Sequence, residues 1–72
     1  MSNVHSARYQ KFLQKFRKAR LDSGLTQLGV ARRLKKPQSY VSKCESGERR
    51  VDVAELQLFA KLYKKPLSYF EA

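Results

Sequence analysis

The chain has 72 residues, and its 16 Lys and Arg against 6 Asp and Glu give it a formal net charge of +10. This length allows one small domain, whose core supplies only about 3–5 kcal/mol of net stability, so a helical fold with short connections is favoured. No apolar run approaches the ~20 residues that cross a bilayer, and the N-terminus lacks a signal peptide's apolar segment. The single cysteine cannot form an internal disulfide. We therefore expect a cytoplasmic protein.

End signals and apolar spacing predict the first two helices. After a tail that we expect to be frayed, Ser6 is a suitable N-cap, and apolar residues then recur every three or four positions. Gly24 can adopt the left-handed conformation that ends a helix, and Thr26 can cap the next one. The expected ranges are residues 1–5 for the tail, 6–23 for the first helix and 27–34 for the second.

Proline, glycine and a capping pair delimit the rest of the chain. Pro37 does not fit a helix interior, so a new helix begins beside it and ends at Gly47. Asp52, with Glu55 three residues later, is a capping pair for a fourth helix, and Pro66 breaks the chain before a last one. No strand pattern is present, so we predict an all-α fold, a compact five-helix bundle forming a single domain over residues 1–72. Its last three helices are expected over residues 38–46, 52–63 and 67–71.

The third predicted helix has two different sides. On a helical wheel Val41 and Cys44 point toward the core, and the opposite arc of about 140° carries short or hydrogen-bonding side chains. Side chains of this kind suit close approach to base edges in a major groove. A glutamine amide can bond adenine, and a lysine can donate to guanine. The candidate base-reading residues are Gln38, Ser39, Ser42 and Lys43, with Ser46 on the same arc.

Groups that can hold phosphate flank this helix. Gln27 lies at the start of the second helix, where free backbone N–H groups and the helix dipole favour an anion. The Tyr40 hydroxyl could reach a phosphate, or the ring could pack against the second helix. A polar helix with cations on both sides favours binding to double-stranded DNA over an ordinary solvated surface. The candidate phosphate-binding residues are Gln27, Lys35, Lys36, Tyr40, Arg49 and Arg50.

Three motifs carry a resemblance to a known family. They are a Gly-Leu-Thr-Gln run at 24–27, an eleven-residue step from Val30 to Val41, and a Glu-Ser-Gly run at 45–47. With these motifs the chain resembles the helix-turn-helix domain of the lambdoid phage repressor and Cro (XRE-type) family, over about Phe12 to Phe70. The resemblance implies a five-helix bundle whose third helix enters the major groove, often as a homodimer on a two-fold symmetric site.

The resemblance also implies roles for single residues. Gln27 would contact phosphate; Gln38, Ser39 and Lys43 would read bases; and Arg20 with Glu45 would form a structural salt bridge between the first and third helices. Two positions depart from the family pattern. Lys35 stands where glycine is common, and Pro37 stands where Ser or Thr usually caps the third helix.

The remaining features indicate no catalysis. There is no nucleophile–base arrangement, no phosphate-cradling glycine loop, and no second ligand near His5, so we expect no enzyme activity, metal, cofactor or small-molecule ligand. Cys44 is expected to be a small buried residue. The C-terminal apolar side chains exceed what one short turn can bury, so they are candidate homodimer contacts. These are Tyr63, Leu67, Tyr69 and Phe70.

We interpret the sequence as a sequence-specific DNA-binding transcriptional regulator, a repressor or an activator, acting as a homodimer. A rival hypothesis is an adaptor similar to the helix-turn-helix part of multiprotein-bridging coactivators or of antitoxins, which acts mainly through a protein partner. Leu28 and the C-terminal aromatic residues would then form the interface. Membrane-surface binding is disfavoured, because the basic residues are spread over several faces.

Overall fold

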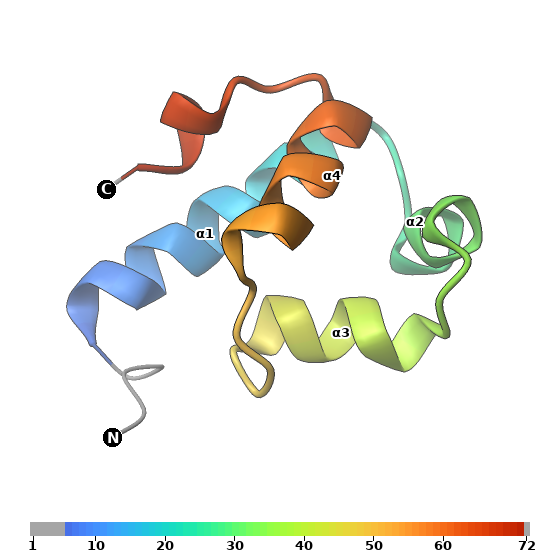
Figure 1. The fold of residues 1–72 in the computed structure, drawn as a ribbon, viewed down its shortest axis with the longest axis horizontal. Coiled ribbons are helices and arrows are strands. Elements are labelled where there is room, and N and C mark those ends of the chain that lie inside the picture. Colours follow the sequence, from blue (N-terminus) through green and yellow to red (C-terminus); the bar gives the residue numbers. More distant parts are fainter. Residues whose placement is uncertain (1–5, 72) are drawn as a thin grey trace.

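The computed structural model describes residues 6–71, which form four α-helices and one 3-10 helix (Figure 1). The elements are α1 (Ala7–Asp22), α2 (Gln27–Leu34), α3 (Gln38–Ser46), α4 (Val53–Tyr63) and η1 (Leu67–Phe70). No strand occurs within this range, so the all-α prediction is confirmed. The tail expected at residues 1–5 lies outside the described residues.

Side-chain caps start three of the helices. The Ser6 hydroxyl accepts a hydrogen bond from the Tyr9 amide at 3.1 Å, and the Thr26 hydroxyl accepts one from the Gly29 amide at 3.0 Å. Asp52 and Glu55 form a reciprocal capping box at α4. Because Ser6 and Asp52 have extended backbones, α1 and α4 begin one residue later than predicted.

Left-handed residues end the helices, and two of them are lysines. Gly24 and Gly47 have φ values of 77° and 86°, as expected of glycine after a helix. Lys35 and Lys64 have φ values of 58° and 59°, where a side chain costs about 1 kcal/mol. The helix-turn-helix connection therefore keeps the left-handed geometry that glycine usually supplies. Pro37 then starts α3 without a side-chain cap.

The fifth predicted helix is not an α-helix. Pro66 and Leu67–Phe70 form a short 3-10 turn, in which the Tyr69 amide donates to the Pro66 carbonyl and the Glu71 amide donates to the Ser68 carbonyl. A segment of four residues is too short for a run of i→i+4 hydrogen bonds, so the tighter 3-10 form is adopted. The turn places Phe70 against Phe12 and Phe16 of α1.

The core lies where the four α-helices meet, and Phe70 of η1 joins it. Its largest fully buried side chains are Phe16, Val30, Val41, Cys44 and Phe59. Phe16 and Phe59 pack edge to face with their ring centroids 4.8 Å apart. α2 packs mainly on α3, and α3 lies along the lower edge of the molecule in Figure 1. This arrangement leaves the outer side of α3 open.

Candidate nucleic-acid interface

The outer side of α3 carries the four candidate base-reading residues, which we call the reading face. Gln38, Ser39 and Lys43 are exposed, and Ser42 is half-buried. The Ser42 hydroxyl donates to the Ser39 carbonyl at 3.2 Å, so its oxygen can still accept from a base. Val41 and Cys44 are buried on the opposite side, which confirms the sidedness predicted by the wheel. The reading face is thus an accessible polar surface that carries two serines, a glutamine and a lysine.

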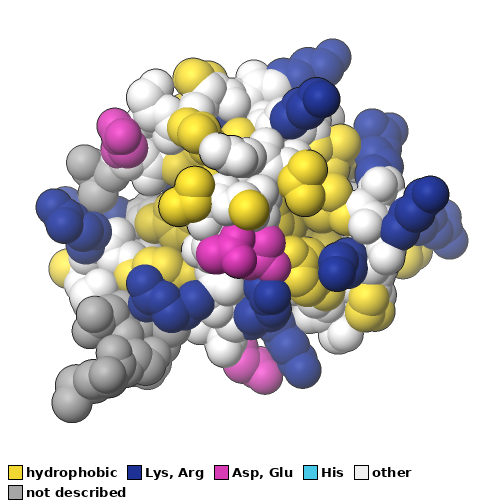
Figure 2. All heavy atoms as spheres, in the orientation of Figure 1, with side chains coloured by type: hydrophobic (Ala, Val, Ile, Leu, Met, Phe, Trp, Pro, Cys, Tyr) yellow, Lys and Arg dark blue, Asp and Glu magenta, His cyan; other side chains and the backbone are white. Residues whose placement is uncertain are grey.

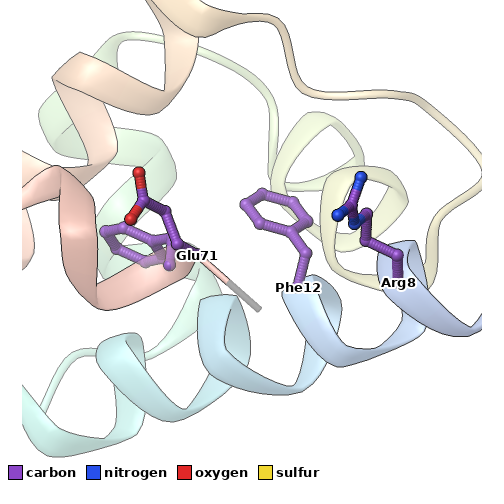
Figure 3. Close-up of a pocket in the computed structure, with 4 residues that line it drawn as sticks. Arg8, Phe12 and Glu71 are labelled. Atoms are coloured by element: carbon purple, nitrogen blue, oxygen red, sulfur yellow. The ribbon is translucent and has the colours of Figure 1, made fainter.

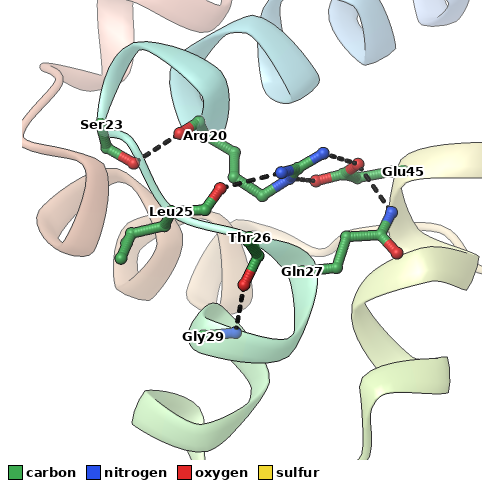
Figure 4. Close-up of polar contacts among 7 residues, drawn as sticks. All are labelled: Arg20, Ser23, Leu25, Thr26, Gln27, Gly29 and Glu45. Carbon is green, nitrogen blue, oxygen red and sulfur yellow. Dashed lines mark hydrogen bonds and ion pairs between the residues drawn. The ribbon is translucent and has the colours of Figure 1, made fainter.

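A buried ion pair fixes α3 to the end of α1. Arg20 Nε lies 2.5 Å from Glu45 Oε2, and Arg20 Nη2 donates to Glu45 Oε1 at 3.2 Å (Figure 4). The two side chains are only 9% and 5% exposed. Arg20 Nη1 also donates to the Leu25 carbonyl at 2.9 Å, and the hydrogen bond to Glu45 raises the pKa of Arg20. The pair therefore joins α1, the loop before α2, and α3.

Gln27 has an internal partner in this structure. Its amide Nε2 donates to Glu45 Oε1 at 3.0 Å, on the side of the carboxylate away from Leu25 (Figure 4). The side chain therefore links the first turn of α2 to α3. A phosphate at this point would meet the backbone N–H groups of the first turn, which helix geometry leaves without intrahelical partners.

The other flank of α3 is cationic, and its cations are held in place. Arg49 Nη1 lies 2.7 Å from Glu55 Oε2, and the same oxygen accepts from the Tyr40 hydroxyl at 2.8 Å. The Tyr40 ring stacks on Phe59 of α4, with the centroids 6.1 Å apart. Lys36 and Arg49 both lie over this ring. The Tyr40 hydroxyl therefore already has an acceptor within the chain.

Arg50 and Lys35 are placed differently from Arg49. Arg50 lies over the Tyr9 ring at 4.5 Å, and the Tyr9 hydroxyl accepts from the Val51 amide at 3.1 Å. These contacts direct Arg50 toward the start of α1. Lys35 is exposed in the turn between α2 and α3. The structure thus brings Lys36, Tyr40 and Arg49 together and separates Arg50 from them.

The ion pair makes Glu55 sensitive to acid. Its hydrogen bond with Arg49 is the main reason that the pKa of Glu55 falls from 4.5 to about 2, and Tyr40 and the Asp52 amide add to the effect. A lowered folded-state pKa means that the stabilisation is complete above pH 4.5 and is lost as pH falls toward 2. We expect the urea midpoint of wild type to fall more steeply over this window than that of Glu55→Gln. Parallel curves for the two proteins would contradict this assignment.

The candidate dimer contacts divide between core and surface. Tyr63 and Phe70 are each 3% exposed and close the core of the chain itself. Leu67 is 42% exposed and Tyr69 is half-buried, so these two remain at the surface. A hollow of about 460 Å³ lies nearby between α1 and the end of η1, lined by Arg8, Phe12, Phe70 and Glu71 (Figure 3). Its lining holds no nucleophile–base pair.

Sequence reasoning missed three residues that contact the side chains of candidate DNA-binding residues. Glu55 was expected only as a helix cap, yet its second oxygen holds Tyr40 and Arg49. Glu48 lies 3.9 Å from Lys43 Nζ, and Tyr9 supports Arg50. The capping pattern gave a signal for Glu55, because it placed the carboxylate near the loop that carries Arg49. The other two contacts depend on tertiary placement.

A helix-turn-helix family model matches residues 16–70, from the middle of α1 through η1. No curated protein and no solved structure matches the chain significantly. Within residues 6–71 no group of His, Cys, Asp or Glu could hold a metal ion, and no helix is long and apolar enough to span a membrane.

Proposed function

Because the chain belongs to the helix-turn-helix family of the Cro/C1 (XRE) type, a family of DNA-binding regulators, we propose that it is a sequence-specific transcriptional regulator. In this proposal α3 enters the major groove and the reading face contacts base edges. The observation that carries the proposal is the exposed polar outer side of α3, held at a fixed angle by the Arg20–Glu45 pair. A cytoplasmic location is part of the same proposal.

Base recognition is assigned to the reading face. Gln38 stands at the start of α3, where its amide suits adenine, and Lys43 stands on the side nearer Tyr40, where its amine suits guanine. Ser39 and Ser42 keep the helix close to the bases and can donate or accept. The buried Val41 and Cys44 side chains hold the opposite side of α3 to the core.

Phosphate binding is assigned to the two ends of this surface. The first turn of α2, at Gln27, offers backbone N–H groups to one strand, and Lys35, Lys36 and Arg49 offer charge to the other. These contacts supply affinity without sequence preference. Tyr40 supports the cations rather than reaching phosphate itself, and Arg50 would join at the edge through its place on Tyr9.

We assign dimer formation to the surface part of the C-terminal group. Leu67 and Tyr69 remain outside the core and would meet the same residues of a second copy about a two-fold axis. Each copy would then read one half-site, with the half-sites about one helical turn of DNA apart.

Replacing Lys43 by alanine tests the assignment of the reading face. We expect Lys43→Ala to weaken binding to the preferred duplex by about 1–3 kcal/mol and to reduce discrimination against a duplex changed at the contacted base pair. Competition titrations with the two duplexes measure both effects.

Lys11→Ala is the matched control, because it removes the same charge from an exposed position on α1. It should lower affinity for both duplexes alike and leave their ratio unchanged. If Lys43→Ala also left the ratio unchanged, the reading face would be assigned wrongly.

A second candidate function is the adaptor role, in which a protein partner dominates. Leu28 at the start of α2 is 43% exposed, at a place where DNA binding would favour a polar residue. Leu28→Gln separates the two functions. If the chain is a regulator, Leu28→Gln should leave its affinity for duplex DNA unchanged or increase it. If the chain is an adaptor, the same change should abolish binding to the protein partner.

A further inference from the structure

One carboxylate lies in the middle of the cationic flank. Glu55, on the first turn of α4, uses both oxygens: Oε1 accepts from the Asp52 amide at 3.0 Å, and Oε2 accepts from Tyr40 and pairs with Arg49. Figure 2 shows one face of the molecule, on which acidic side chains at the centre lie directly above Lys and Arg side chains. The carboxylate is 18% exposed, so it is largely covered by its partners.

The guanidinium group of Arg49 has partners on one nitrogen and exposed donors on the other two. Its Nη1 faces Glu55 and also lies 3.2 Å from the Arg50 carbonyl, and its guanidinium carbon lies 4.9 Å from the centre of the Tyr40 ring. Within residues 6–71, Nε and Nη2 of Arg49 make no hydrogen bond, and the side chain is 44% exposed. The group therefore keeps donors for an external oxygen while its position is fixed.

We propose that Glu55 is a positioning residue for DNA binding, which holds Arg49 against Tyr40 so that its open donors face the DNA backbone beside α3. The inference rests on the proposed function and extends it to a residue that touches no DNA. Fixing a long side chain before binding removes rotamer entropy that the complex would otherwise lose. A planar guanidinium in a fixed orientation also suits a phosphate better than a freely moving one.

The proposal makes a prediction opposite to that of net charge. Glu55 is negative and lies near the DNA, so simple electrostatics predicts that removing its charge strengthens binding. A positioning role predicts weaker binding, because Arg49 loses the partner that orients it. The sign of the change therefore separates the two accounts.

Glu55→Gln is the test variant, because glutamine preserves the capping box at the third helical position while removing the charge. The probe is a fluorescent mixed-sequence duplex of about 25 base pairs, a little over two turns of B-DNA. Titrations between about 50 and 200 mM salt give the affinity and its salt dependence. Urea unfolding of each protein shows that binding is measured on folded material.

We expect Glu55→Gln to bind roughly three- to tenfold more weakly, with a salt slope smaller by about 0.9, as for the loss of one phosphate contact. Glu48→Gln is the matched control: it removes a carboxylate that is 67% exposed and only loosely paired with Lys43, at 3.9 Å, so that it holds no cation in place and its removal should strengthen binding. In an Arg49→Ala background, Glu55→Gln should no longer weaken binding, because the group that it positions is gone.

Three other results would contradict either the positioning role of Glu55 or the proposed function. If Glu55→Gln strengthens binding as Glu48→Gln does, the positioning role is wrong and the charge acts only at a distance. If Glu55→Gln unfolds, Tyr40→Phe replaces it, since this change removes the hydroxyl that orients Glu55 without altering charge; unchanged affinity and salt slope would then overturn the proposal. Failure of wild type to bind any duplex would instead overturn the proposed function.

Discussion

Replacing Glu45 by alanine should unfold much of the chain at room temperature. The change leaves the Arg20 guanidinium, 9% exposed, without its carboxylate, and removal of one partner from a buried ion pair costs about 3–5 kcal/mol. Gln27 loses its acceptor as well. A domain of this size has only about 3–5 kcal/mol of net stability, so the loss is comparable with the total. Far-UV circular dichroism, followed by urea titration in the cold, measures it.

Two further variants show why Glu45→Ala loses stability. Lys18→Ala breaks the exposed pair between Lys18 and Asp22 and should leave the melting temperature almost unchanged. Replacing both buried partners together, by Arg20→Met with Glu45→Leu, should recover most of the stability, because no charge remains buried alone. If Glu45→Ala destabilised the chain no more than Lys18→Ala, the pair would not fix α3 to α1.

Replacing Phe59 by alanine should lower the free energy of unfolding by a similar amount, but for a different reason. The Phe59 ring is fully buried and contacts the rings of Phe16, Tyr40 and Tyr63. Its removal leaves a cavity among these rings, and Phe→Ala changes in cores cost about 3–5 kcal/mol. Because Tyr40 rests on Phe59, the cavity also removes the support of the cationic flank.

Phe59→Leu keeps enough volume to remain folded and should cost clearly less than Phe59→Ala. Urea unfolding gives the free energy of unfolding for both variants. The matched control is Leu58→Ala, one residue away on α4 but 60% exposed, which should change the urea midpoint little. Equal losses at positions 58 and 59 would contradict the core that we describe.

The capping residues and the apolar spacing predicted the helices, because both depend on residues only three or four positions apart. Ser6, Thr26 and Asp52 each cap a helix through a hydroxyl or carboxylate close in sequence, and their contacts follow from residue type and spacing. Val41 and Cys44 entered the core as their spacing on α3 required. The last element was wrong in type, since its short length after Pro66 favours a 3-10 turn over an α-helix.

The side-chain partners of the interface could not be predicted in the same way. Tyr40 lies fifteen residues before Glu55, and the stacking of its ring on Phe59 of α4 brings the two side chains together. Arg49 lies six residues before Glu55 in the loop that leads to α4, but its position in the sequence does not show that it turns toward the carboxylate. Arg50 adjoins Arg49 in sequence but turns toward Tyr9, a residue of α1. Residue type indicated a cationic flank, whereas the orientation of each cation depends on neighbours that are distant in sequence.

Selection from random duplex DNA by the purified protein, near physiological salt, tests the central claim most directly. Sequencing of the bound duplexes should give a motif with two-fold symmetry and half-sites about one helical turn apart, as expected of a dimer that reads DNA through α3. The same selection with Lys43→Ala should change the motif at the base pair that this side chain contacts. Recovery of bound duplexes without any enriched motif would contradict sequence-specific recognition by this chain.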